Sequence, residues 1–130
     1  MTHVLVVDDS PTFRRLVCPM LREAGYRVSE AVNGEDALVA LEASQERLVV
    51  LLDVVMPKLG GIGVLNTVDA SEELARRHVF ILVTSSPEVV PPHLTADMLR
   101  RLRVPLLTKP FASEQLLDMV EQAAGRLQAV

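Results

Sequence analysis

The sequence has very little cysteine, few aromatic residues and no long apolar run. Cys18 is the only cysteine among 130 residues, so an internal disulfide is impossible, which fits a reducing compartment. Aromatic residues make up only 3% of the chain, so Leu, Val, Ile, Met and Ala must build the core. No apolar run reaches the roughly 18 residues of a membrane span, and no basic segment precedes the first apolar run. We therefore expect a cytoplasmic protein without membrane insertion.

The chain also lacks an excess of positive charge. It carries 13 Lys and Arg against 17 Asp and Glu, a formal net charge of −4. Direct nucleic-acid binding needs a basic face, and the basic residues here are scattered in pairs such as Arg14-Arg15 and Arg76-Arg77. We therefore expect no direct nucleic-acid partner. Apolar residues make up 49% of the chain, which at this length predicts one domain with a full core.

Short apolar runs alternate with segments of helical period, a pattern typical of βα units and a parallel sheet. The expected strands cover about residues 4–7, 27–31, 48–52, 79–83 and 104–107. The expected helices cover about residues 11–24, 34–41, 62–73, 92–101 and 114–127. The sequence therefore predicts an α/β fold with five strands.

Several residues are expected to begin or interrupt these helices. Ser10 or Asp9 is placed to cap the first helix, Asn33 the second and Ser113 the last. Pro19 lies inside the first helix, where it removes one hydrogen bond and clashes with the preceding turn. We expect a kink or an early break there, or two short helices in place of one.

The polarity of the strands predicts their order in the sheet. The first, third and fourth runs are apolar throughout, as in strands that are covered on both faces. The second run is polar, and the fifth contains Pro105, which lacks a ladder N–H, so both are expected at edges. Right-handed crossovers then give a doubly wound, flavodoxin-like parallel sheet of order 2-1-3-4-5, with helices on both faces.

Chemically capable side chains stand where four of these strands end. Asp8 and Asp9 follow the first run, Asp53 the third, Thr84 the fourth and Lys109 the fifth. The carboxyl ends of parallel strands meet at one edge of the sheet, where such folds bind their ligands. Three carboxylates, a hydroxyl and an ammonium group are therefore expected to converge.

This set of groups suits a divalent cation and a phosphoryl group. Carboxylates in one crevice repel one another, and Mg²⁺ relieves that repulsion with oxygen ligands. Asp8 and Asp9 would hold the ion directly or through water, Asp53 would share it, and the backbone carbonyl of Val55 would add an oxygen. A carboxylate beside Mg²⁺ can attack phosphorus, and Lys109 and Thr84 would then neutralise the phosphoryl oxygens.

Five segments carry a resemblance to a known family. Nearly the whole chain resembles the receiver domain of two-component response regulators, and its first segment looks like that of chemotaxis-type single-domain receivers. The segments are VVDDSPTFRR at residues 6–15, AVNGEDAL at 31–38, LLDVVMP at 51–57, Thr84-Ser85, and TKPF at 108–111.

The resemblance implies a role for each residue of the site. Asp53 would be the phosphoacceptor, Asp8 and Asp9 would organise Mg²⁺, Thr84 would move toward the phosphoryl group, and Lys109 would pair with it. The phosphodonor would be a sensor histidine kinase, a phosphotransfer protein or a small donor such as acetyl phosphate. The output would pass to a downstream protein partner, from a signalling domain that is not an enzyme and is a monomer or weak dimer. Residues 1–124 would form the receiver domain, and residues 125–130 a tail or the start of a linker.

The chain departs from the family pattern at two places. Leu106 occupies a position where the family usually has Tyr or Phe, so we expect phosphorylation to persist while output depends on movement of the Thr84 loop. Pro91-Pro92 cannot lie inside a helix, so the fourth helix is expected to begin late, near Pro92 or His93.

Two other functions compete with this interpretation. A pseudo-receiver would act as an interaction module without phosphorylation, an alternative that Leu106 keeps open. A phosphatase of the haloacid dehalogenase type also uses an aspartate nucleophile and Mg²⁺, but places a second acid two residues later. Ser10 and Pro11 occupy those positions here, which disfavours the phosphatase.

Overall fold

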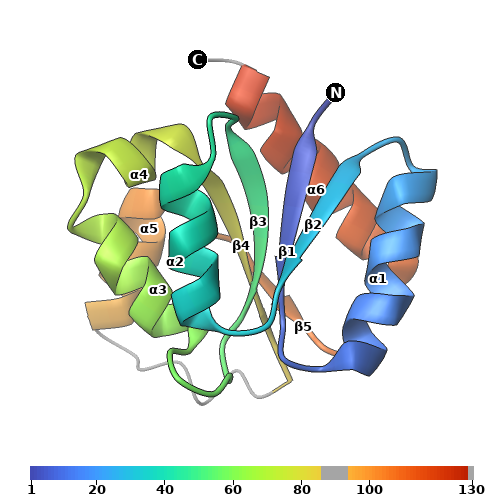
Figure 1. The fold of residues 1–130 in the computed structure, drawn as a ribbon, viewed down its shortest axis with the longest axis horizontal. Helices are drawn as coiled ribbons and strands as arrows, with labels where there is room; N and C mark the ends of the chain where they lie inside the picture. The colour runs from blue at the N-terminus through green and yellow to red at the C-terminus, as the bar shows by residue number, and fades with distance from the viewer. Residues whose placement is uncertain (86–93, 129–130) are drawn as a thin grey trace.

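The computed structural model describes residues 1–85 and 94–128 and contains one five-stranded parallel sheet of order β2-β1-β3-β4-β5 (Figure 1). The strands are β1 His3–Val7, β2 Arg27–Ala31, β3 Leu48–Asp53, β4 Val79–Thr84 and β5 Leu106–Thr108. The helices are α1 Pro11–Glu23, α2 Gly34–Ala43, α3 Gly61–Asp69, α4 Glu72–Arg77, α5 Leu94–Leu102 and α6 Ser113–Gln128. The predicted fold class and strand order are confirmed.

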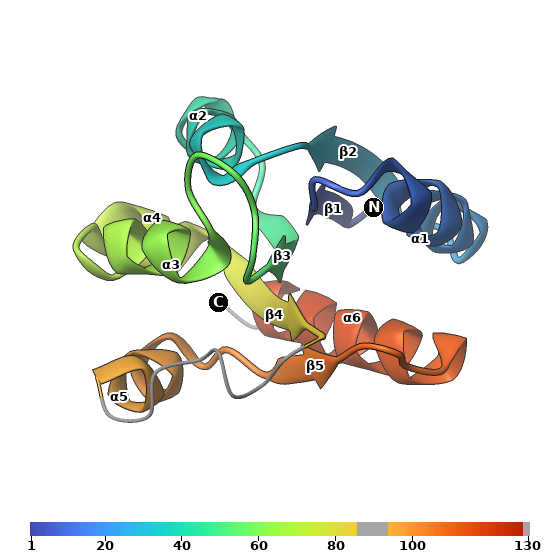
Figure 2. The same ribbon diagram turned by 90° about the horizontal axis from the view of Figure 1, so that it is seen from below.

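Helices cover both faces of the sheet, with α1 and α6 on one side and α2 to α5 on the other (Figure 2). Successive side chains of a strand point to opposite faces, and the two cores follow that alternation. Val4 and Val6 of β1 pack with α1 and α6, whereas Leu5 and Val7 pack with the helices of the other layer. The central strands are buried on both faces, as their uninterrupted apolar runs predict.

The segment expected to be one helix over residues 62–73 is two helices, and this prediction was wrong. Helix α3 ends at Asp69, and the side chain of Ser71 accepts a hydrogen bond from the Leu74 N–H at 3.3 Å to cap α4. A hydroxyl in that position satisfies one of the free N–H groups of a new helix. The capping serine therefore marks a helix start that apolar period alone does not show.

Helix α1 runs without a break from Pro11 to Glu23, so the break expected at Pro19 is not observed. Pro19 lies on the exposed side of the helix, while Val17, Cys18 and Leu21 on both sides of it are buried. Packing of the helix on the sheet outweighs the loss of one hydrogen bond.

Three capping predictions had different outcomes. Ser10 caps α1 by accepting a hydrogen bond from the Phe13 N–H at 3.2 Å, and Asn33 caps α2 through the Asp36 N–H at 2.8 Å. Ser113 is the first residue of α6 rather than its cap, since the carbonyl of Ala112 accepts the bond from the Leu116 N–H.

Strand β5 is an edge strand, as expected, but begins at Leu106 rather than at residue 104. Pro105 lies just before it and contributes only its carbonyl, which accepts a hydrogen bond from the Leu82 N–H at 3.0 Å. A proline here needs no ladder donor. The expected start of the fourth helix at Pro92 or His93 lies outside the described residues. In the part of the chain that the structure describes, no helix is long and apolar enough to cross a membrane.

Candidate functional site

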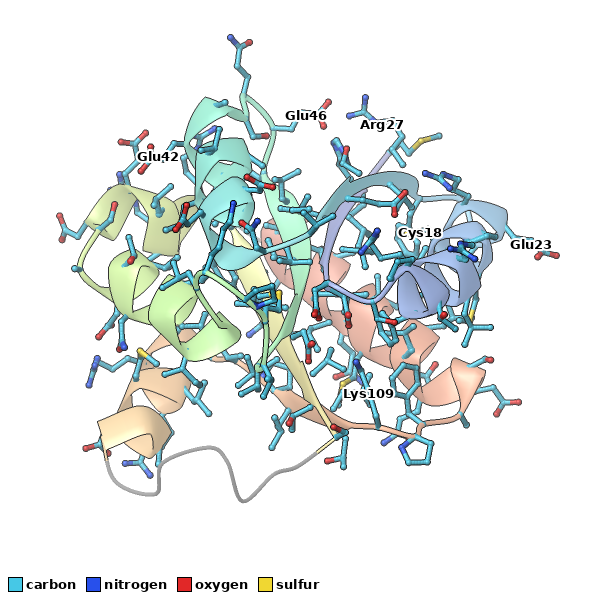
Figure 3. All side chains as sticks on the ribbon, turned by 60° about the horizontal axis from the view of Figure 1, so that its bottom comes forward. Cys18, Glu23, Arg27, Glu42, Glu46 and Lys109 are labelled. Atoms are coloured by element: carbon cyan, nitrogen blue, oxygen red, sulfur yellow. The ribbon has the colours of Figure 1, made fainter. Side chains whose placement is uncertain are left out.

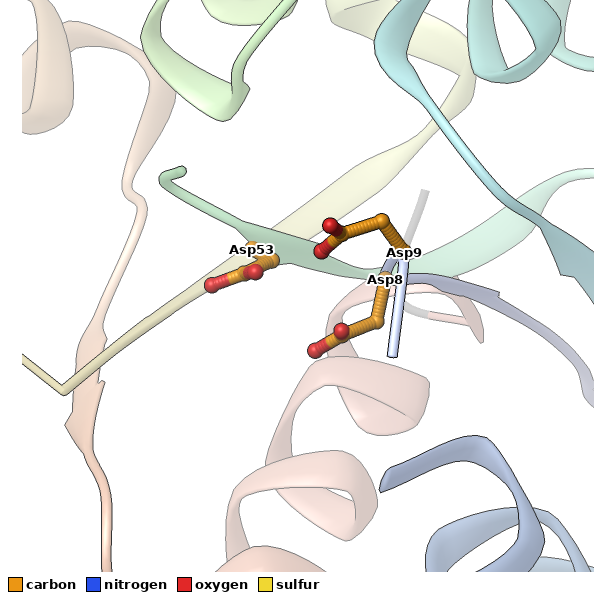
Figure 4. A group of neighbouring side chains, drawn as sticks. All are labelled: Asp8, Asp9 and Asp53. Carbon is orange, nitrogen blue, oxygen red and sulfur yellow. The ribbon is translucent and has the colours of Figure 1, made fainter. Parts of the chain in front are cut away.

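Three aspartates meet at the carboxyl edge of the sheet (Figure 4). Asp53 is the last residue of β3, and Asp8 and Asp9 directly follow β1. Strands β1 and β3 are hydrogen-bonded neighbours with Val7 opposite Leu52, which places these strand ends side by side. One carboxylate oxygen from each aspartate lies within 4.8 Å of the others. The convergence expected from the sequence is present.

Lys109 brings a positive charge to the same place. Its side chain points from the segment after β5 toward the carboxyl ends of the strands (Figure 3). The Lys109 Nζ lies 3.0 Å from Asp8 Oδ2 and 3.8 Å from Asp53 Oδ1. The peptide bond between Lys109 and Pro110 is cis.

Asp53 is held in a setting that opposes its ionisation. Burial, together with the nearby Asp8 carboxylate, raises the pKa of Asp53 to about 6, while Lys109 acts in the opposite direction. The side chain of Asp53 is only 12% exposed, so water screens these charges weakly. Asp9 is exposed and faces solvent at the rim. A hard divalent cation among these oxygens would remove the repulsion, and the donor set fits Mg²⁺.

The backbone around Asp8 is fixed by local contacts. The Ser10 N–H donates to Asp8 Oδ1 at 2.9 Å, which sets the direction of this buried carboxylate. The guanidinium of Arg14 donates to the carbonyl oxygen of Asp8 and also to Glu30 Oε1 at 3.0 Å. Sequence reasoning missed Arg14, although its place in the first turn of the helix after the acidic pair was a usable signal.

Thr84 ends β4 and is almost fully buried, one residue beyond the partner of Asp53 in the register. Its carbonyl oxygen accepts a hydrogen bond from the Lys109 N–H at 2.7 Å. The backbones that carry the predicted hydroxyl and ammonium groups are therefore bonded directly to each other. Val55, expected to offer a carbonyl oxygen, lies in the exposed turn after Asp53.

Phe13 is a second residue that the sequence did not assign to the site. Its partly buried ring packs against the core on the α1 and α6 side of the sheet and lies under the lysine, with Lys109 Nζ 4.1 Å from the ring centroid. The ring of Phe111 packs edge-to-face on it, with centroids 6.2 Å apart and planes at 82°. A cation over an aromatic face is attracted to it, so Phe13 adds a third contact to Lys109.

The loop after Asp53 is closed by backbone hydrogen bonds. The Gly61 N–H donates to the Val54 carbonyl at 3.0 Å, and the Gly34 N–H donates to the Leu59 carbonyl at 2.9 Å. A Cβ on Gly34 would collide with that Leu59 oxygen. Glycine at the start of α2 thus allows the loop beside the acidic cluster to dock there.

The family model of the response regulator receiver domain matches residues 4–121. The chain belongs to this family. It is 34% identical over 123 residues to protein PilH of Pseudomonas aeruginosa, covering 92% of this chain and 95% of that protein. It is 31% identical to the transcriptional regulatory protein PdtaR of Mycobacterium tuberculosis, covering 98% of this chain but 59% of that protein. The chain also spans about half of a probable transcriptional regulator ycf27 of Cyanidium caldarium, 47% of its length at 31% identity.

Solved receiver structures have the same fold. The response regulator TrrA of Thermotoga maritima, in complex with Mg²⁺ and BeF, aligns with a TM-score of 0.79 and 28% identity over 95% of this chain and 99% of that one. The chemotaxis protein CheY4 of Vibrio cholerae aligns with a TM-score of 0.76 and 28% identity over 95% and 98%. The chain is therefore a receiver domain of a two-component system, which is a signalling domain in a family that binds Mg²⁺ at an acidic pocket.

Proposed function

We propose that Asp53 accepts a phosphoryl group in a Mg²⁺-dependent transfer and that the modified surface is read by a downstream protein. The observation that carries this proposal is the cluster of Asp8, Asp9 and Asp53 with Lys109 between two of the carboxylates. An ammonium group and a divalent cation are the charges that a phosphoryl group needs around it. The similarity to TrrA, which was solved with Mg²⁺ and BeF, supports the same site.

Each side chain of the site has a role in the proposed transfer. An Asp53 oxygen attacks the phosphorus of the donor, and the bond from phosphorus to the donor nitrogen or oxygen breaks, with its electron pair leaving on the donor. Asp8 and Asp9, with Asp53 and the Val55 carbonyl, would hold Mg²⁺, which when bound neutralises phosphoryl charge. Lys109 would turn from Asp8 toward the phosphoryl oxygens, and the Thr84 hydroxyl would donate to another.

We propose a sensor histidine kinase, a phosphotransfer protein or a small phosphodonor as the source of the phosphoryl group. A cytoplasmic location fits the family. We propose a monomeric or weakly dimeric state. We propose residues 1–124 as the receiver domain and residues 125–130 as a tail or the start of a linker. Helix α6 itself continues to Gln128, and Leu127 is buried. Leu106, at 36% exposure on the edge strand, offers no ring to bury, so we assign the output to movement around Thr84.

The test is the intact mass of the protein after incubation with Mg²⁺ and acetyl phosphate. We expect one labile phosphoryl adduct that is absent without Mg²⁺ and absent in Asp53→Asn. Asp118→Asn, which removes an exposed carboxylate on α6, is the matched control and should be modified like the wild type. An adduct that persists in Asp53→Asn would place the acceptor elsewhere. A wild-type protein that takes no adduct would favour the pseudo-receiver.

A further inference from the structure

Five arginines line one cavity at the end of the sheet opposite the aspartates. The cavity has a volume of about 210 Å³, and none of its described lining residues is acidic. This concentration of cations is unexpected in a chain of net charge −4. The charged and titratable side chains that line it are Arg47, Arg76, Arg101, Arg103, Arg126 and His78.

The cavity is separate from the phosphorylation site. Arg47 directly precedes β3, His78 precedes β4, and Arg103 lies shortly before β5, so the lining comes from the amino ends of the strands. The aspartates stand at the carboxyl ends of the same strands. In Figure 1 the start of β1 and the end of α6 mark the end of the molecule that holds the cavity.

Two of the arginines are held in place by the ends of helices. The guanidinium of Arg47 donates to the carbonyl oxygens of Arg76 and Arg77, both at 3.0 Å, and of Leu127 at 2.6 Å. Arg126 Nη1 donates to the Arg103 carbonyl oxygen at 2.6 Å. These bonds fix the two cations against the ends of α4, α5 and α6, so these two of the five guanidinium groups are preorganised.

Helix ends alone do not balance this charge. Three helix C-termini supply about one and a half negative charges together, against five guanidinium groups. Of the five, Arg101 alone forms an ion pair within the described residues, with Asp69 at 2.6 Å. The cavity therefore retains a positive excess that a multiply charged anion would neutralise.

A second, independent observation concerns the hydrogen bonding of the Arg126 guanidinium. Its Nη2 is buried and has no hydrogen-bond partner among the described residues, a state that costs free energy for a charged donor. Burial, and then the nearby Arg103, lowers the pKa of Arg126. An anion in the cavity would supply both an acceptor and the opposite charge.

We propose that this cavity binds the phosphate groups of a small polyphosphate, either inorganic pyrophosphate or the phosphate tail of a nucleotide. Planar guanidinium groups match phosphate oxygens in a two-bond geometry, and several of them favour more than one phosphate. The cavity is smaller than the roughly 300–1,000 Å³ of a whole small-molecule site, so it would take the phosphates alone.

A neighbouring cavity offers space for the rest of a nucleotide. It has a volume of about 570 Å³, shares Arg103 and Arg126 with the first, and has apolar walls that include Leu99, Val104 and Met119. A base seated there could also stack on a guanidinium group. A nucleotide that also filled the second cavity would bind more tightly than inorganic pyrophosphate, so a comparison of their affinities distinguishes the two ligands.

Binding is measured by calorimetry without Mg²⁺, at low and at physiological salt, with pyrophosphate, ATP and adenosine as probes. We expect saturable binding of pyrophosphate and ATP, weakening as salt rises, and none of adenosine. Tighter binding of ATP would identify a nucleotide tail, and equal or weaker binding of ATP an inorganic ligand. Absence of saturable binding of both phosphates would overturn the proposal.

Paired variants separate a site from general charge. Among the described residues, the side chains of Arg76 and Arg103 form no hydrogen bond or ion pair, so the double variant R76Q/R103Q should fold normally. It should bind at least about tenfold more weakly. The matched control R15Q/R22Q removes two charges on α1 and should bind within about twofold of the wild type. An equal loss of affinity in both double variants would show that binding depends only on net charge and would contradict a specific site. Asp53→Asn should bind normally, since this site does not depend on the phosphoacceptor.

Discussion

Lys109 and Phe13 form a cation–π contact beside Asp53, the proposed phosphoacceptor, with the ammonium nitrogen 4.1 Å from the ring centroid. The same nitrogen is bonded to Asp8 at 3.0 Å, while Asp53 lies farther away at 3.8 Å. The ring is itself fixed by its edge-to-face contact with Phe111. Phe13 is therefore a positioning residue, which limits where the Lys109 ammonium group can go before the proposed phosphorylation of Asp53.

Replacing Phe13 by Leu keeps apolar bulk and removes the aromatic face. We expect phosphorylation of Asp53 by acetyl phosphate to slow by about two- to tenfold, because a contact of roughly 0.5–1.4 kcal/mol no longer orients Lys109. Phe13→Tyr retains the ring and should react like the wild type. The ring current on the Lys109 ε-methylene in NMR spectra should vanish in Phe13→Leu alone. Equal rates in Leu and wild-type proteins would show that the ring only packs.

Asp53 should destabilise the metal-free protein at neutral pH. Its folded pKa of about 6 lies above the ordinary 3.8, so the folded state binds the proton more tightly. That stabilisation is complete below pH 3.8 and is lost as the pH rises through 6. Asp53→Asn should therefore raise the free energy of unfolding at pH 7.5 by about 1–3 kcal/mol in EDTA, and by less at pH 5. Urea unfolding at the two pH values measures this, and a less stable Asn variant would contradict it.

Addition of Mg²⁺ provides the complementary measurement. A cation that binds only the folded state raises its stability by mass action. We expect Mg²⁺ to raise the melting temperature of the wild type more than that of Asp53→Asn, which lacks one of the three proposed carboxylate ligands. The same shift in both proteins would mean that Asp53 does not share the ion.

Buried His78 is expected to have the opposite pH dependence. Its Nδ1 accepts a hydrogen bond from the Leu48 N–H at 3.0 Å, so its Nε2 carries the proton that faces the Leu41 carbonyl at 3.2 Å. Burial lowers the pKa of this imidazole. The folded state therefore binds the second proton more weakly, and the stability that neutral His78 contributes is lost as the pH falls below about 6.5.

His78→Phe should cost about 2 kcal/mol at pH 7.5, because two buried backbone groups lose their partners. The difference from the wild type should shrink at pH 5.5. His78 is then protonated in the unfolded wild type, so folding must either bury the imidazolium or release its proton. Urea unfolding of both proteins at both pH values gives the comparison. A difference that does not change with pH would show that the pKa of His78 is the same in the folded and unfolded states.

Two glycines should respond to alanine in opposite directions. Gly34→Ala should lower the free energy of unfolding by about 1–3 kcal/mol, since the new Cβ meets the Leu59 carbonyl oxygen. Gly125→Ala should raise it by about 0.5–1 kcal/mol, because this exposed position in α6 has no atom within 4 Å of the added carbon. Thermal melts of the two variants make the comparison, and a stabilised Gly34→Ala would contradict the loop contact.

The sequence predicted the sheet and the acidic cluster because both depend on short local patterns. Apolar runs identify strands, their polarity identifies edges, and a parallel sheet then brings Asp8 and Asp53 together without further information. Arg14 could have been found from its place in the first helical turn after the acidic pair. The role of Phe13 could not be found this way, because its partner Lys109 lies far along the chain.

The errors in the helices have a similar origin. Pro19 lowers local helix propensity, but packing of Val17 and Leu21 on the sheet decides the outcome. The division between α3 and α4 depends on one hydroxyl of Ser71, which a search for apolar period passes over. The helix predictions therefore failed at Pro19, where a tertiary contact decides the structure, and at Ser71, where a single capping hydrogen bond does.

The hydrogen bond from the Lys109 amide to the Thr84 carbonyl joins the two segments expected to respond to phosphorylation, so exchange of this amide reports on their separation. Strand β5 has three residues and is paired on one side only, so its hydrogen bonds should open at a lower free energy than those of the central strands. Deuterium uptake at this one amide would record each separation of the lysine segment from the threonine segment. Comparing the protection of this amide with and without a phosphoryl mimic would show whether the mimic changes how often the hydrogen bond between Lys109 and Thr84 opens.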